Sequence, residues 1–114
     1  LEASTAAFVN AGCAVRGERC AAVAGRDVVQ RFLPLQNALV ELVGPASAGG
    51  QGADSGTSFW GVTFVSLDLA GAGAALGPHV GAPRPAVQPG RLIAVAAREA
   101  GLGTRVAFMT PRDR

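Results

Sequence analysis

The two halves of this 114-residue chain repeat the same order of short segments, and this repeat limits the folds open to it. The opening segment LEASTAAF lies over LAGAGAAL at 69–76. A GR pair at 25–26 recurs at 90–91, and an apolar, strand-like segment follows each pair. NALVELVGP near the end of the first half matches TRVAFMTP at the end of the second. The conserved order and similar spacing indicate an internal duplication.

Apolar periodicity and turn residues predict one helix followed by three strands in each half. In the first half we expect a helix over 2–11 and strands over 13–16, 27–33 and 37–43. In the second half we expect a helix over 69–76 and strands over 82–87, 91–98 and 104–110. The strand-like segment FWGVTFVSL precedes the second helix, so the full unit reads βαβββ. The first module is therefore expected to lack its leading strand.

These elements predict an α+β fold, with a single domain over 1–114 made of two modules. Module one covers 1–44 and module two covers 59–112. The segment 45–58 between them is rich in Gly, Ser and Ala and has no apolar periodicity, which is typical of a flexible linker. No Lys-Ser or Lys-Thr pair follows its glycines, so a phosphate-binding loop is not expected there.

Composition narrows the class of partner. The net charge is only +2, and arginines do not cluster with aromatic residues, so nucleic acid is not expected. No apolar run approaches the ~20 residues that span a bilayer, and the opening stretch has no basic leader, so we expect a cytoplasmic protein. Cys13 and Cys20 either face each other across a hairpin or are two buried thiols. Together with His79, expected in an exposed loop, they are too few for a zinc site.

Paired βαβββ modules are the plan of the vicinal oxygen chelate superfamily, and two segments resemble its members. GAPRPAVQPGRLIAVAAREAGLGTRVAFMTPR at 81–112 is similar to the second module of bacterial glyoxalase-like domain proteins. NALVELVGP at 37–45 resembles the last strand of a first module. The resemblance implies that each module curls its sheet into half of a cup. It also implies a divalent metal, where one is bound, that stabilises an enolate or related oxyanion of the substrate.

The resemblance leaves three classes of function open. The first is a metal-assisted lyase, isomerase or dioxygenase with a small-molecule substrate. The alternative is a metal-free protein that binds or sequesters a small molecule, of the bleomycin-resistance type. The third is a partial domain whose main property is dimerisation. Because the missing strand would leave a free sheet edge, we expect a homodimer in each case.

Of the family's four metal-ligand positions, only one is matched by a metal-binding side chain. Glu41 falls at the second position, whereas the first would lie on the absent leading strand. The third falls near Trp60 or Gly61, and the fourth near Ala107, so two positions carry no ligand. Glu41 is thus the sole metal candidate, and the resemblance implies that Glu41, Trp60 and Phe108 contact a ligand inside the cup. No catalytic residue is identified.

Glu41 also stands out without the resemblance, because its strand is otherwise apolar after Asn37. Strand alternation places it on the same face as Leu39 and Val43. A lone carboxylate is costly to bury unless it is paired, so Glu41 either faces a wet cavity or meets an arginine. The candidate partners are Arg31, Arg98 and Arg105. Trp60 has the same two interpretations, as the wall of a cavity or as part of the core.

Overall fold

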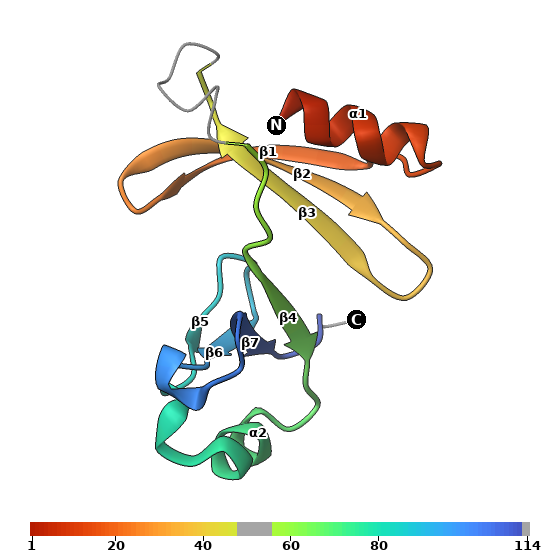
Figure 1. Ribbon diagram of the computed structural model, residues 1–114. Coiled ribbons are helices and arrows are strands. Elements are labelled where there is room, and N and C mark those ends of the chain that lie inside the picture. The colour runs from red at the N-terminus through yellow and green to blue at the C-terminus, as the bar shows by residue number, and fades with distance from the viewer. Residues whose placement is uncertain (48–55, 113–114) are drawn as a thin grey trace. The chain divides into compact units, whose positions relative to one another are not determined.

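The computed structural model describes residues 1–47 and 56–112, and the chain has an α+β fold. It divides into two compact units, Leu1–Ser58 and Phe59–Arg114. Each unit contains one α-helix and one β-sheet (Figure 1). No helix in the described part of the chain is long and apolar enough to cross a membrane.

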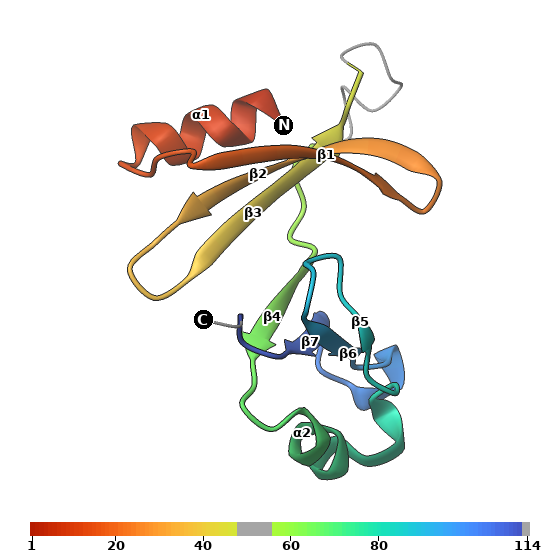
Figure 2. The ribbon, with the colours of Figure 1, turned by 180° about the vertical axis from the view of Figure 1, so that it is seen from behind.

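The first unit consists of a helix followed by an antiparallel three-stranded sheet in the order β1-β2-β3. In Figures 1 and 2, α1 lies along one face of this sheet. The β1–β2 hairpin turns at Ala24 and Gly25, which both have positive φ, as in a type I′ hairpin turn. The elements are α1 (Glu2–Asn10), β1 (Gly17–Val23), β2 (Arg26–Pro34) and β3 (Leu39–Pro45).

The core of the first unit lies between α1 and the sheet. Leu33 of β2 is fully buried, with 0% of its surface exposed. Its neighbour on the same face, Arg31, contacts α1 through Glu2 at 2.9 Å and the Thr5 hydroxyl at 3.1 Å. Gly44 of β3 lies so close to Leu1 that a Cβ there would come within 2.7 Å of the Leu1 Cβ. Because successive strand residues alternate in direction, the opposite face of the sheet points away from α1.

The second unit has the element order strand, helix, strand, strand, strand, with the strands in one sheet in the order β4-β7-β6-β5. The first strand, β4, pairs in parallel with the last, β7, whereas the remaining pairs are antiparallel. Figure 2 shows these strands beside one another, with α2 following β4. The elements are β4 (Gly61–Val65), α2 (Leu69–Leu76), β5 (Arg84–Pro85), β6 (Leu92–Val95) and β7 (Arg105–Met109).

A capped helix and a small apolar core stabilise the second unit. Asp68 caps α2, because its side chain accepts a hydrogen bond of 2.9 Å from the Gly71 N–H. The buried side chains are Leu69 at the start of α2, Ala94 of β6 and Met109 of β7. Single helical turns of the 3-10 type at Gly77–His79 and Arg98–Ala100 complete the unit.

The expectation of a strand over 13–16 is wrong. The strand begins instead at Gly17. The RGER segment at 16–19 resembles a turn, but its residues from Gly17 on pair with β2 and belong to β1. Both interpretations of the cysteines also fail: Cys13 is half-buried after α1, Cys20 is exposed on β1, and both are free thiols. The other expected strands and both helices are present within a few residues of their predicted ends. Most of the expected linker, 48–55, lies outside the described residues.

Candidate functional site

Glu41 lies on the face of the first sheet that points away from α1. In the β2–β3 ladder it is opposite Phe32, and in the β1–β2 ladder Gln30 is opposite Arg19. Directly paired residues share a face, and Gln30 and Phe32 alternate with Arg31, which contacts the helix. Arg19, Gln30, Phe32 and Glu41 therefore gather on one surface, which we call the open face.

A chain of hydrogen bonds crosses the open face from β1 to β3. Gln30 is its centre and is 7% exposed. The Gln30 Nε2 donates to Glu41 Oε1 at 2.6 Å, and the Gln30 Oε1 accepts from the Nε of Arg19. The Arg19 guanidinium lies 5.3 Å from the centre of the Phe32 ring, a cation–π contact. A single buried amide thus links a cation on β1 to a carboxylate on β3.

This arrangement orients the carboxylate but does not neutralise it directly. Within the described residues, the Glu41 carboxylate has one hydrogen-bond donor, at Oε1, and no ion pair. The side chains on either side of it along β3, Leu39 and Val43, are about half-exposed. The open face therefore presents an exposed carboxylate, held at Oε1, between half-exposed apolar side chains, and this carboxylate can accept hydrogen bonds from a cationic or N–H donor group.

Arg31, the one candidate arginine in the same unit as Glu41, does not contact it. Arg31 is on the helix face, where Glu2 at 2.9 Å and Glu18 at 2.7 Å hold its guanidinium. These hydrogen bonds raise the pKa of Arg31, and the same bond from Arg31 lowers the pKa of Glu2. Arg98 and Arg105 belong to the second unit. The residue connected to Glu41 is instead Arg19, through Gln30.

The two aromatic residues expected in the cup lie in the second unit, whereas Glu41 lies in the first. Trp60 is 70% exposed, and the Arg105 guanidinium lies 4.7 Å from its ring centre. Phe108 of β7 stacks on Phe64 of β4, with the ring centres 6.1 Å apart. Trp60 is therefore not a core residue, and each ring already has a neighbour within its own unit.

The described residues do not supply the donor set of a four-ligand metal site. No group of three or more His, Cys, Asp or Glu side chains in that part of the chain is placed to hold a metal ion. Near the family's third and fourth positions stand Trp60, Gly61 and Ala107, which offer no ligand atom. A hard cation requires several oxygen ligands, and Glu41 alone offers too few.

Sequence reasoning missed Arg19 and Gln30. The Arg19–Gln30 pair depends on the β1–β2 register, which the local pattern around Arg19 does not specify. The available signal was the polar Gln30 within the apolar strand DVVQRF, since a polar residue there needs a partner. Comparison of the chain with protein-family models, with curated proteins and with solved structures finds no significant match.

Proposed function

We propose that this chain is a small-molecule-binding domain of the glyoxalase-like, vicinal oxygen chelate type, with the open face as part of its ligand surface. The observation that carries the proposal is the fixed Glu41 carboxylate on the sheet face away from the helix. Glu41 is exposed to solvent on this face. Here the buried Gln30 holds it in one orientation between apolar neighbours.

The order of elements supports the family assignment. The second unit has the strand–helix–three-strand order expected of one module, within a single sheet. The first unit has a helix and three strands. In such a module the face away from the helix would form the inside of the cup, and Glu41 lies on that face.

We favour ligand binding over metal-assisted lyase, isomerase or dioxygenase chemistry. The described residues do not provide the four ligands of such a metal centre. The hydrogen bond from Gln30 also occupies one oxygen of the candidate ligand Glu41. What remains is a carboxylate able to accept hydrogen bonds from an organic cation.

A pair of matched probes tests the proposal. Benzamidine carries a planar cation on an apolar ring, and benzamide has nearly the same shape without the charge. We expect saturable NMR shifts of β2 and β3 amides with benzamidine and much weaker ones with benzamide. Glu41→Gln should weaken benzamidine binding by about 1–3 kcal/mol, because it removes a charged acceptor while keeping the shape. Equal binding by the variant and the parent protein would refute the assignment of Glu41.

The proposal includes a homodimer formed through the free edge of β3. Among the described residues, β3 pairs with β2 alone, which leaves one row of its backbone groups without a strand partner. An exposed edge with half-exposed Leu39 and Val43 favours pairing with a second chain. Light scattering should show concentration-dependent association, which Val43→Lys weakens. A monomer at all concentrations would contradict it.

A further inference from the structure

A tight turn in the second unit brings two polar side chains together. It runs from Gln88 to Arg91, with Pro89 at its second position and Gly90 at its third. Gly90 has φ of 75°, and the Arg91 N–H donates to the Gln88 carbonyl at 3.3 Å, as in a type II turn. Proline and glycine both suit this backbone, so the first and last residues of the turn are fixed relative to each other.

Arg91 is held in place by the end of β7. Its Nε donates to the Thr110 carbonyl at 2.7 Å. Thr110 is itself fixed to Leu92, because its N–H donates to the Leu92 carbonyl at 3.0 Å and its hydroxyl accepts from the Leu92 N–H at 2.9 Å. A guanidinium has five N–H donors, so anchoring through Nε leaves the four on its terminal nitrogens for another partner.

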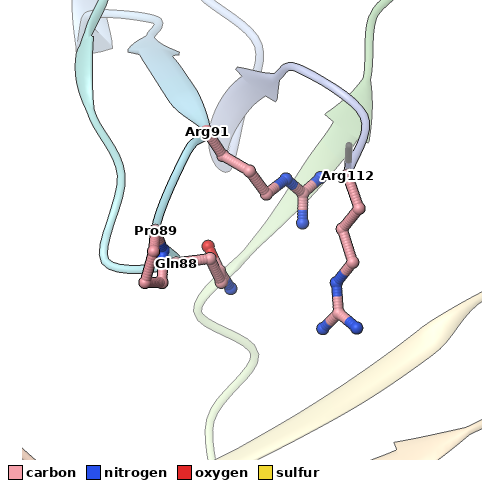
Figure 3. Close-up of a pocket in the computed structure, with 4 residues that line it drawn as sticks. All are labelled: Gln88, Pro89, Arg91 and Arg112. Carbon is pink, nitrogen blue, oxygen red and sulfur yellow. The ribbon is translucent and has the colours of Figure 1, made fainter. Parts of the chain in front are cut away.

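A second guanidinium lines the same space. Arg112 follows Thr110 by two residues, and with Gln88, Pro89 and Arg91 it lines a pocket of about 270 Å³. Figure 3 shows the Arg91 and Arg112 side chains and the Gln88 amide around this space. Within the described residues, neither guanidinium forms an ion pair with a carboxylate. Asp113 lies outside those residues and is included in the test below.

We propose that Gln88, Arg91 and Arg112 bind an oxyanion, a phosphate or a carboxylate, independently of the open face. Two guanidiniums around one space repel each other, and an anion between them removes this repulsion. Their planar N–H donors match the paired oxygens of carboxylate and phosphate. The pocket lies just below the usual size range of ligand pockets, roughly 300–1,000 Å³, which suits a small anion.

The test is an NMR titration of the whole chain with sodium phosphate and, separately, with succinate, at constant ionic strength. We expect saturable shifts at the amides of Gly90, Arg91 and Arg112 with at least one of the two anions. The tighter probe shows whether the site prefers phosphate or carboxylate. Titration with chloride alone should give no saturable shift.

Single variants separate this site from general charge. Arg91→Gln and Arg112→Gln should each weaken binding roughly tenfold or more, since each removes a charged donor. Arg98→Gln makes the same change of charge at an exposed position outside the pocket and should leave binding unchanged. Arg112→Gln keeps the experiment interpretable if Arg91→Gln unfolds the unit by losing its bond to Thr110.

Each titration is repeated with Asp113→Asn, which removes the carboxylate that follows Arg112 in the sequence. Absence of saturable binding in both backgrounds overturns the proposal. Equal loss of affinity in Arg98→Gln and Arg112→Gln also overturns it, because binding would then follow net charge alone.

Discussion

Replacing Glu41 by leucine tests whether the hydrogen-bonded chain stabilises the first unit. The variant removes the charged acceptor that lies 2.6 Å from the Gln30 amide nitrogen, and Gln30 is 7% exposed. A hydrogen bond to a charged group contributes about 1.5–3 kcal/mol, and the exposure of Glu41 favours the lower end of this range. Leucine suits a strand better than glutamate by a few tenths of a kcal/mol at most. We therefore expect a net loss of about 1–2 kcal/mol.

Glu41→Gln is the matched control, because its amide oxygen still accepts from Gln30 without the charge. Its loss should be smaller, about 0.5–1 kcal/mol. Native-state hydrogen exchange of the β2 amides measures both changes within the first unit, and urea unfolding followed by circular dichroism gives the same ranking. If Glu41→Leu is as stable as Glu41→Gln or more stable, Glu41 does not satisfy Gln30 and the chain of hydrogen bonds has no energetic role.

Three further predictions concern the frame around these surfaces. Leu33→Ala should cost about 2–5 kcal/mol in urea unfolding, because Leu33 is fully buried, whereas Leu35→Ala at an exposed position should cost far less. Gly71→Ala should lower the melting temperature, because the new Cβ would collide with the Asp68 carboxylate that caps α2. Gly73→Ala in the same helix should raise the melting temperature, because its Cβ would meet no atom within 4 Å and alanine favours a helix more than glycine does. The hydrogen bond from Arg31 lowers the pKa of Glu2 below its ordinary value of 4.5. The Glu2 contribution to stability is therefore fully present above pH 4.5 and is lost as the pH falls through the lowered pKa. Glu2→Gln should remove this part of the acid dependence of the melting temperature.

Local sequence signals predicted those parts of the fold that depend on nearby residues. The LAGAGAAL helix and the alternation along β3 follow from helix propensity and period-two patterning within a few residues. Alternation also placed Glu41 with Leu39 and Val43. These features do not depend on which strand pairs with which.

The features that were missed depend on pairing between strands. The segment beginning at Gly17 contains charged residues that are typical of a turn, yet Glu18 pairs with Arg31 and Arg19 with Gln30 across β1 and β2. These pairs satisfy the charged side chains and extend the strand. The same cross-strand contacts decide which arginine approaches Glu41. Arg31 was expected there, but one position along β2 places it on the opposite face, against α1.

The open face and the pocket at Arg91 have opposite charge, so each serves as a control for the other. Glu41 presents a carboxylate, and Arg91 and Arg112 present guanidiniums. Benzamidine should therefore perturb β2 and β3 and be sensitive to Glu41→Gln, but not to Arg112→Gln. Phosphate should show the reverse pattern. If one variant weakens both probes, the loss follows overall charge or folding and not the mutated site, and the assignment of that site is wrong.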